Sequence, residues 1–254
     1  MQEKRYFVCS DLHGQYDLWK QIKEYLGEND VLIFLGDAID RGPWGIKIMQ
    51  EMFADPRVIY LLGNHEDMML DWWLSRGEQE EYQYLNHWYS NGGGPTYHAF
   101  LELGYEEKID IINHIKALDW KLDIDCISCE DEFKIHLSHA KSVPATLIND
   151  RHACIWNRNH FHKWPKDCHD IVIHGHTPHV YMEKQYGVNF EEDMVTYCDG
   201  HKVCLDWGCF AIGAIPLYNL NELRLEKIFY KEEENKDDER KSNETTSGTS
   251  GDCN

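Results

Sequence analysis

Five short apolar segments of this chain each end directly in a cluster of Asp, Asn, His and Gly residues, and this pattern restricts the possible folds more than any other feature. The segments are 6–9, 31–35, 58–62, 133–137 and 171–173. Runs of β-branched and aromatic residues closed by glycine are typical of buried strands. Because the polar clusters follow the strands, the pattern predicts an open α/β sheet with its ligands at the carboxyl edge.

The segments between these strands predict helices first and further strands later. Residues at helical spacing form three sets: Leu18, Ile22, Tyr25 and Leu26; Ile46, Met49 and Phe53; and Met68, Met69, Trp72 and Trp73, which we interpret as core. Gly92–Pro95 is expected to separate two helices. From residue 121 the predicted elements are strands, at 121–127, 133–137, 195–198, 202–206 and 214–230. This order predicts two packed sheets with helices outside.

The composition divides the chain near residue 230. A length of 254 residues suits one domain, and residues 231–254 contain no aromatic or aliphatic residue. We therefore expect a folded domain over 1–230 and a disordered acidic and polar tail over 231–254. The net charge is −20, of which −16 belongs to residues 1–230. This charge disfavours partners that need clustered positive charge, namely nucleic acids and anionic membranes.

The sequence also predicts a cytoplasmic protein. No apolar run approaches the 18 residues of a membrane-spanning helix, and the start, MQEKRYFVCS, lacks the apolar stretch of a signal peptide. Nine cysteines without such a signal indicate reduced thiols. Cys126 and Cys129 form a lone CxxC, for which Cys204 and Cys209 are too widely spaced to complete a convincing zinc site.

Six donor residues at the predicted strand ends indicate two metal ions: Asp11, His13, Asp37, Asn64, His139 and His176. One ion does not need six such groups, whereas two ions held about 3.5–4 Å apart do, with a carboxylate between them. Asp11 and His13 can bind one ion, the last three donors can bind the other, and Asp37 can bridge. Because the set has no cysteine, a hydrolytic site with open positions is favoured over a structural zinc site.

Charge counting favours an anionic substrate at such a centre. Two divalent ions, two carboxylates and a bridging hydroxide leave about one positive charge, so the centre stays electrophilic. Arg41 lies in an Asp-Arg-Gly turn and offers a planar fork of donors to phosphate oxygens. Arg158 is a second candidate, although a surface arginine is the simpler interpretation. Asn64 is a candidate for substrate contact as well as a ligand.

His65 follows Asn64 and is predicted to be a general acid, although a further metal ligand is the alternative. A phosphate ester must expel a basic oxygen, to which a protonated imidazole can donate. Asp40 is expected to orient that ring, and a turn or helix-capping role for it is compatible. Glu66 and Asp67 are interpreted as helix caps. His174 should face the opposite side of its strand from His176 and be structural.

These motifs together resemble the phosphoprotein phosphatase family of metallophosphoesterases. The ordered set is Asp-x-His-Gly, Gly-Asp-x-x-Asp-Arg-Gly, Gly-Asn-His-Glu, a later His-Ala, and Gly-His-Thr-Pro. Asn86-His-Trp88, Asn91-Gly-Gly-Gly94 and Ile155-Trp-Asn-Arg158 are most similar to the branch of bacteriophage lambda protein phosphatase and its bacterial relatives. The resemblance covers most of residues 5–220.

The resemblance implies a four-layer α/β/β/α sandwich, the calcineurin-like metallophosphoesterase fold, with two metal ions at one edge. By motif position it implies that Asp11, His13 and Asp37 bind the first ion, and that Asp37, Asn64, His139 and His176 bind the second. It also implies the acid pair of His65 and Asp40, the phosphate-binding pair of Arg41 and Arg158, and Mn²⁺ as the expected metal, with Fe or Zn as alternatives.

Three positions depart from the family pattern. Ser10 stands where glycine is usual, and little effect is expected because the residue is still small. Leu62 stands where many members have arginine, and this difference can change the support of the site or the substrate preference. Ser138-His139-Ala140 replaces the His-Gly-Gly of the eukaryotic branch. This difference argues against eukaryotic regulatory partners.

The predicted function is a protein serine/threonine phosphatase that uses a hydroxide bound by both metal ions, with phosphotyrosine and small phosphate esters as further substrates. A bis(5′-nucleosyl)-tetraphosphatase is the alternative, because such enzymes share these motifs. A metal-binding scaffold without catalysis and a nuclease on the same fold are less favoured. The full donor set with His65 and Arg41 argues against the first, and the acidic body with the Asp-Arg-Gly turn argues against the second. The sequence gives no prediction of oligomeric state.

Overall fold

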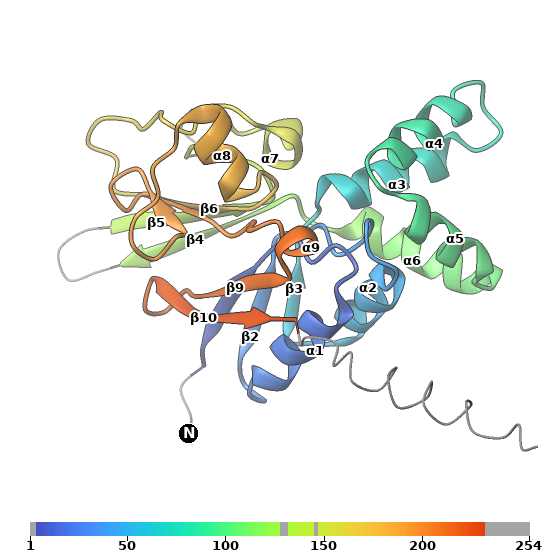
Figure 1. Ribbon diagram of the computed structural model, residues 1–254, viewed down its shortest axis with the longest axis horizontal. Helices are drawn as coiled ribbons and strands as arrows, with labels where there is room; N and C mark the ends of the chain where they lie inside the picture. Colours follow the sequence, from blue (N-terminus) through green and yellow to red (C-terminus); the bar gives the residue numbers. More distant parts are fainter. Residues whose placement is uncertain (1–3, 128–131, 145–146, 232–254) are drawn as a thin grey trace, which may run out of the picture.

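The computed structural model describes residues 4–127, 132–144 and 147–231, so Cys129 and nearly all of the predicted tail lie outside the described residues. Two five-stranded sheets face each other, with helices on both outer faces (Figure 1). This arrangement confirms the predicted two-sheet sandwich.

The first sheet has the strand order β10-β9-β1-β2-β3. Strands β1 (Tyr6–Cys9), β2 (Val31–Phe34) and β3 (Val58–Tyr60) are parallel and are linked by helices α1 (Tyr16–Tyr25) and α2 (Gly45–Ala54). Strands β9 (Ala214–Asn219) and β10 (Arg224–Tyr230) add an antiparallel hairpin. The parallel order places the carboxyl ends of β1, β2 and β3 side by side.

The second sheet has the order β4-β5-β6-β8-β7. Its strands are β4 (Lys121–Ile127), β5 (Glu132–Ser138), β6 (Ile171–His174), β7 (Thr196–Tyr197) and β8 (Lys202–Cys204), and its helices are α7 (Arg151–Trp156) and α8 (His179–Tyr186). The short α9 (Cys209–Ile212) precedes β9, and its Cys209 packs in the core of the first sheet. Strands β5, β6 and β8 are mutually parallel. Their carboxyl ends therefore also share one edge.

Four helices between β3 and β4 form an arm that extends from the sandwich (Figure 1). They are α3 (Asn64–Ser75), α4 (Glu81–Ser90), α5 (Gly94–Glu102) and α6 (Tyr105–Ala117). The predicted break over 92–95 separates α4 from α5, and a proline stands in the first turn of α5, where its missing N–H costs nothing. The stripe that includes Trp72 and Trp73 is buried in the core, as predicted.

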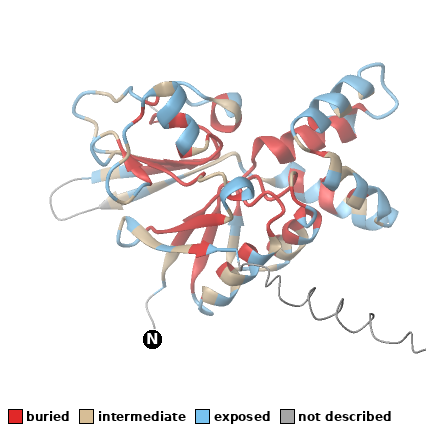
Figure 2. Ribbon diagram, viewed as in Figure 1, coloured by how far each residue is buried: buried red, intermediate tan, exposed pale blue. Residues whose placement is uncertain are grey.

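Alternation along the strands explains the layers. On β1, Phe7 and Cys9 belong to the core under the helices, whereas Val8 belongs to the core between the two sheets. A third cluster, which includes Met182 of α8 and Tyr197 of β7, fills the outer face of the second sheet. Figure 2 shows the buried residues concentrated in the strands and at the edge where the loops meet.

The predicted strands need three corrections of extent. The stretch 214–230 is a hairpin of two strands and not one, because residues 220–223 turn the chain back. The predicted strand over 195–198 keeps only Thr196–Tyr197, and the one over 202–206 ends at Cys204. Among the described residues, no helix combines the length and the apolar character that crossing a bilayer requires.

Candidate metal centre

Loops at the carboxyl ends of β1, β2, β3, β5 and β6 bring the candidate residues together. Six of the ten predicted site residues have positive φ although none is glycine: Asp11, His13, Asp37, Asp40, Arg41 and His176, with φ between 44° and 72°. Such conformations are strained and cluster at functional sites. At Gly63 and Gly175 an added Cβ would lie 2.2 Å from carboxylate oxygens of Asp37 and Asp11, so glycine is required there.

Three donor atoms predicted for one ion converge on each other. Asn64 Oδ1 lies 2.9 Å from His139 Nε2 and 2.8 Å from His176 Nδ1, and the two ring nitrogens are 3.1 Å apart. The other ring nitrogen of His139, Nδ1, lies 3.0 Å from the Leu35 carbonyl, to which it can donate, so Nε2 is left free for a ligand role. This set fits one cation.

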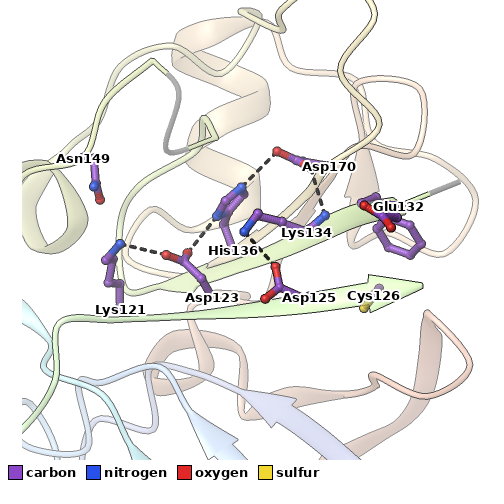
Figure 3. Close-up of a pocket in the computed structure, with 10 residues that line it drawn as sticks. Lys121, Asp123, Asp125, Cys126, Glu132, Lys134, His136, Asn149 and Asp170 are labelled. Carbon is purple, nitrogen blue, oxygen red and sulfur yellow. Dashed lines mark hydrogen bonds and ion pairs between the residues drawn. The ribbon is translucent and has the colours of Figure 1, made fainter. Parts of the chain in front are cut away.

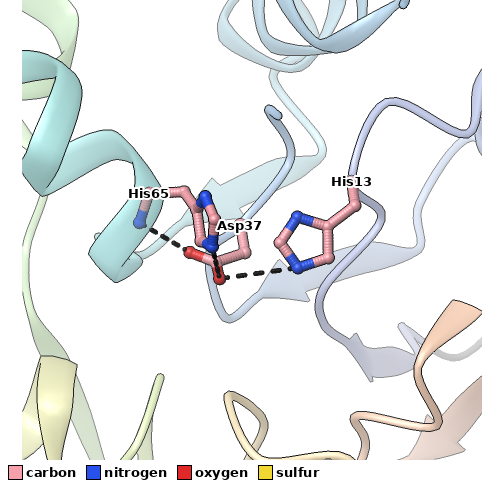
Figure 4. A group of neighbouring side chains, drawn as sticks. All are labelled: His13, Asp37 and His65. Atoms are coloured by element: carbon pink, nitrogen blue, oxygen red, sulfur yellow. Dashed lines mark hydrogen bonds and ion pairs between the residues drawn. The ribbon is translucent and has the colours of Figure 1, made fainter. Parts of the chain in front are cut away.

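The donors predicted for the other ion lie on the opposite side of Asp37. His13 Nδ1 lies 2.9 Å from the Ile39 carbonyl, which turns Nε2 toward the carboxylates. That Nε2 is 3.7 Å from Asp37 Oδ2 and 3.9 Å from Asp11 Oδ1. Figure 4 shows His13 and His65 facing Asp37 from two sides. The alternative of His65 as a ligand is geometrically compatible, because its Nε2 is also 3.7 Å from Asp37 Oδ2.

Asp37 occupies the position expected of a bridge. Its Oδ1 accepts the backbone N–H of His65 at 3.0 Å, and its Oδ2 faces His139 Nε2 at 3.3 Å in addition to the two rings of Figure 4. Asp11 Oδ1 is buried and has no hydrogen-bond partner among the described residues. Buried polar atoms without partners are costly, so the donor set fits bound divalent cations.

The protonation states of the protein alone are consistent with cation binding. Burial lowers the pKa of His13 and of His176, which keeps these rings neutral as ligands must be. Burial also opposes charge on His139, but Asp37 and Asp11 outweigh it and raise the pKa of His139 to about 9. Without a metal ion, the protonated ring of His139 places a positive charge beside Asp37 and Asp11. A bound metal ion would supply that positive charge instead.

His65 and Asp40, the residues predicted to form the acid pair, are in contact. His65 Nδ1 is 2.6 Å from Asp40 Oδ2, and His65 Nε2 is 3.3 Å from Arg41 Nη2 and faces Asp37. Burial lowers the pKa of His65, but the charge of Asp37 and the hydrogen bond to Asp40 outweigh it, so the pKa is raised. A raised pKa favours the protonated form that an acid needs.

The two predicted arginines are held differently. Arg41 is half-buried beside His65, and its backbone N–H donates to the Gly92 carbonyl at 2.9 Å. Arg158 is exposed and follows α7. Its charge lowers the pKa of His176, after burial and His139, which indicates that it lies near the cluster.

The two acidic residues after His65 do more than cap α3. Glu66 accepts the backbone N–H groups of Asp37 and Ala38, each at 2.9 Å, and the Tyr60 hydroxyl at 2.8 Å. Burial and the nearby Asp37 raise the pKa of Glu66 to about 7. Glu66 therefore shapes the turn that presents Asp37, and the expectation of a simple cap is wrong.

Asp67 joins the helical arm to helix α7. It accepts Arg151 Nη2 at 2.5 Å and Trp156 Nε1 at 3.0 Å, both from α7. The capping interpretation is therefore incomplete here too. No local sequence signal indicates these contacts, because the partners lie 84 and 89 residues away.

The sequence analysis did not predict a further buried carboxyl group near the cluster, that of Asp206. Asp206 follows β8, is 1% exposed, and accepts the Gly208 N–H at 2.7 Å. Burial and the charge of Asp11 raise its pKa well above the ordinary value. Its place after an apolar run is the signal that sequence reasoning could have used. His174 lies, as predicted, away from the cluster, with Nε2 2.6 Å from the Tyr197 hydroxyl.

A pocket of about 650 Å³ on the second sheet is separate from this site. Figure 3 shows it lined by residues of β4 and β5 together with Asn149 and Asp170. Its buried His136 lies between Asp123 Oδ1 at 2.7 Å and Asp170 Oδ2 at 3.1 Å. Lys121 pairs with Asp123, and Lys134 pairs with Asp125. These charges neutralise each other, and none of the ten predicted site residues lines the pocket.

The sandwich with two sets of donors at one edge defines a metallophosphoesterase, a hydrolase that uses divalent metal ions. Residues 4–180 match the calcineurin-like phosphoesterase family, and the chain belongs to that family. This membership confirms the predicted fold and the expectation of an enzyme. The special likeness to the lambda phage branch stays a prediction.

Curated relatives include bacterial protein phosphatases. Serine/threonine-protein phosphatase 2 of Salmonella typhimurium is 36% identical over 125 residues, which cover 48% of this chain and 53% of that protein. Its Escherichia coli namesake is 29% identical over 140 residues, covering 53% and 57%. A symmetrical bis(5′-nucleosyl)-tetraphosphatase of Buchnera aphidicola is 24% identical over 153 residues, covering 59% and 48%. The matches span about half the length of these relatives.

Solved structures support the fold alone. The crystal structure of a candidate diadenosine tetraphosphatase has a TM-score of 0.58 at 13% identity and covers 91% of this chain and 95% of that chain. A metallophosphoesterase from Sphaerobacter thermophilus has a TM-score of 0.50 at 16% identity, with coverage of 95% and 93%. Both show the same sandwich, and at this identity they carry no information about substrate.

Proposed function

We propose that this protein hydrolyses phosphomonoesters of serine and threonine in proteins at a centre of two divalent metal ions. The observation that carries the proposal is the convergence of Asn64, His139 and His176 on one side of Asp37, with His13 and the His65–Asp40 pair beside it. A cation site next to a buried imidazole acid is what the cleavage of a phosphate ester requires.

The ligand roles follow the donor geometry. Asp11, His13 and Asp37 would hold one ion, and Asp37, Asn64, His139 and His176 would hold the other. Mn²⁺ is the metal we propose, with Fe or Zn as alternatives, since the donors are oxygen and imidazole only. Such ions, when bound, neutralise phosphoryl charge and lower the pKa of an attacking water.

The remaining roles concern the substrate. Arg41 would bind phosphoryl oxygens beside His65, and Arg158 would approach from the loop after α7. Asn64, through its amide, is a further candidate for substrate contact. His65 would donate a proton from Nε2 to the departing oxygen while Asp40 holds Nδ1. The acid chemistry favours phosphoproteins, because serine and threonine are basic leaving groups that need a proton.

The protein substrate is favoured by two relatives named serine/threonine-protein phosphatase, at 36% and 29% identity. The relative at 24% identity named bis(5′-nucleosyl)-tetraphosphatase supports the alternative substrate, a dinucleoside polyphosphate. Both reactions would use the same metal centre. We further propose that the enzyme acts in the cytoplasm, on phosphoproteins and also on phosphotyrosine and small esters, and that it binds neither nucleic acids nor membranes.

A substrate panel tests this proposal. The full chain is stripped with a chelator, reloaded with Mn²⁺, and assayed on phosphoserine, phosphothreonine and phosphotyrosine peptides, nitrophenyl phosphate and a dinucleoside tetraphosphate. We expect the highest kcat/KM on the phosphoserine and phosphothreonine peptides, with inorganic phosphate as product. Faster cleavage of the dinucleotide would establish the alternative. No hydrolysis of any member would leave a metal-binding scaffold and refute both.

A further inference from the structure

We propose that Trp88 is a positioning residue for the general acid, and that its indole N–H holds the Asp40 carboxylate against His65. This inference rests on the proposed function, because it assigns Trp88 to the acid pair described there. Nothing in the sequence pattern gave Trp88 this role, since it lies 48 residues from Asp40 on a helix of the arm.

The contact itself is direct. Asp40 is completely buried, and its Oδ2 accepts the Trp88 Nε1–H at 2.7 Å while it lies 2.6 Å from His65 Nδ1. The other oxygen, Oδ1, has no hydrogen-bond partner among the described residues. Trp88 therefore supplies one of two donors to a buried carboxylate. A buried charge that loses such a donor is poorly satisfied and free to rotate away from the ring.

The chain around Trp88 contacts the acid turn at two more points. Asp40 and Arg41 have φ of 72° and 63°, so their turn needs external support. The Asp40 N–H donates to Thr96 Oγ1 at 2.8 Å, and the Arg41 N–H donates to the Gly92 carbonyl at 2.9 Å. Residues 88–96 thus hold both the carboxylate and the backbone of the turn.

Glycine 93 makes the close approach of this segment possible. An added Cβ at Gly93 would lie 2.6 Å from Trp88 Cδ1 and Nε1, the edge of the indole that donates to Asp40. The Gly93 N–H also donates to the Trp88 carbonyl at 3.1 Å. The break between α4 and α5 therefore packs against the edge of the Trp88 indole. This packing keeps the indole N–H directed at Asp40.

Trp72 provides a matched control within the same aromatic cluster. Its ring centroid is 5.4 Å from that of Trp88, and both indoles are buried. The Trp72 Nε1 has no hydrogen-bond partner among the described residues. Trp72→Phe and Trp88→Phe thus remove the same atoms from the same core, but only the second removes a donor to Asp40.

The test compares rate losses on a phosphoserine peptide and on nitrophenyl phosphate, with the full chain loaded with Mn²⁺ and under conditions where chemistry limits turnover. The alkoxide of serine needs a proton, whereas nitrophenolate departs readily without one. Trp88→Phe should lose on the order of tenfold more rate on the peptide. Trp72→Phe should lose equally on both substrates. Bound Mn²⁺ should be unchanged in both variants.

The double variant Trp88→Phe with His65→Asn distinguishes a positioning role of Trp88 from a nonspecific loss of structure. If Trp88 acts through His65, Trp88→Phe should add no further substrate bias in the His65→Asn background. Where Trp88→Phe melts without cooperativity, benzothienylalanine at position 88 replaces the indole N–H by sulfur at nearly constant shape. The same bias is expected with this analogue.

Two results would overturn the inference. Equal losses on both substrates for Trp88→Phe or the sulfur analogue, with His65→Asn still biased, would refute the role of Trp88 and leave the proposed acid intact. If Trp88→Phe still adds a larger rate loss on the peptide than on nitrophenyl phosphate in the His65→Asn background, the role of Trp88 is likewise refuted. Absence of bias in His65→Asn itself would instead refute the acid assignment, and the role of Trp88 with it.

Discussion

Arg41 and Arg158 illustrate how residues of one type differ in their support. Arg41 is half-buried, with its backbone tied to Gly92 and its guanidinium 3.3 Å from His65, whereas Arg158 is exposed. A guanidinium with fewer degrees of freedom stabilises a developing charge better. The two are therefore expected to contribute unequally, although we propose that both bind phosphate.

Alanine substitutions test this difference. Arg41→Ala should lower kcat by on the order of 10² and Arg158→Ala by roughly 10, because removal of one preorganised donor has effects of this size. Both variants should keep their bound metal, since neither arginine is a ligand. Steady-state kinetics with metal analysis measures both quantities. Loss of metal from either variant would contradict the division between phosphate-binding and ligand residues.

At the residue scale, the sequence predicted which candidate residues come together but not the residues that support them. Nine of the ten predicted site residues, all but Arg158, are linked by contacts of 3.9 Å or less. The donors follow strands in sequence, so their meeting point could be predicted. Glu66 and Trp88 could not be assigned, because their roles come from contacts with segments 28 and 48 residues away.

Helix α3 carries two acidic neighbours with different tasks. Glu66 accepts the N–H groups of Asp37 and Ala38 and so braces the β2 turn, whereas Asp67 contacts α7. The helix therefore supports the candidate metal centre through Glu66 and contacts α7 through Asp67. At the element scale, the first turn of α3 therefore contacts both the loop after β2 and helix α7.

Glu66→Gln should destabilise the metal centre although Glu66 is not a proposed ligand. Glutamine can accept only one of the two N–H groups well, and its amide hydrogens would oppose the other donor. The expected cost is about 1–3 kcal/mol in the free energy of unfolding, with weaker Mn²⁺ binding. Asp67→Asn is the control and should leave Mn²⁺ affinity near that of the wild type. Equal Mn²⁺ affinity in Glu66→Gln and the wild type would refute the brace.

Lys202 of β8 fixes the loop after α7 from inside the core. It is 0% exposed, and its Nζ donates to the carbonyls of His160 and Phe161 at 2.8 and 2.7 Å. Burial lowers the pKa of Lys202 from 10.5 to about 8. Below pH 8 Lys202 is protonated in both the folded and the unfolded chain, so folding bears the full free-energy cost of burying its charge. Above pH 8 the folded chain releases the proton first, and that cost declines.

The stability difference between the wild type and Lys202→Met should therefore rise from pH 8 to 10.5 in favour of the wild type. The slope for one proton approaches about 1.4 kcal/mol per pH unit. Denaturant titrations of both proteins across this range measure it. A difference that stays flat or falls would show that Lys202 keeps its charge in the folded protein.

The strands of the sandwich were predictable where a short, continuous apolar run marks the whole strand. Strands β1 and β2 have four residues each, of which three in β1 and all four in β2 are buried, as expected of continuous apolar runs. The hairpin of β9 and β10 was predicted as one strand, because Asn219–Leu223 interrupts the apolar run only weakly. The turn there depends on Asn219 Oδ1, which accepts the N–H groups of Asn221 and Glu222. A single asparagine in the sequence does not predict these hydrogen bonds.

The whole molecule combines an acidic body with a cation site. The net charge of −20 leaves the bulk surface repulsive to phosphorylated substrates, so attraction would have to come from the proposed metal centre and from Arg41 and Arg158. The last described residue, Lys231, donates its N–H to the Gly213 carbonyl at 2.7 Å. The predicted division of the chain near 230 is not tested by the fold.

Truncation provides that test. A chain ending at Lys231 should keep its melting temperature and turnover, because residues 232–254 contain nothing apolar to bury. A chain ending at Glu222 is the control and should be strongly destabilised, since it lacks β10, which pairs with β9 from Arg224 to Tyr230. A drop of many degrees in the first truncation would show that the tail packs on the domain.

Manganese binding by the stripped protein and by Asp37→Asn tests the central claim most directly. Native mass spectrometry counts the ions on each chain. The wild type should take up two Mn²⁺ and regain hydrolysis of nitrophenyl phosphate, because the charge of Asp37 holds two cations close together. Asp37→Asn should bind fewer than two ions and lose nearly all activity. Two ions bound normally by Asp37→Asn, with most of the activity kept, would contradict the proposed dinuclear centre.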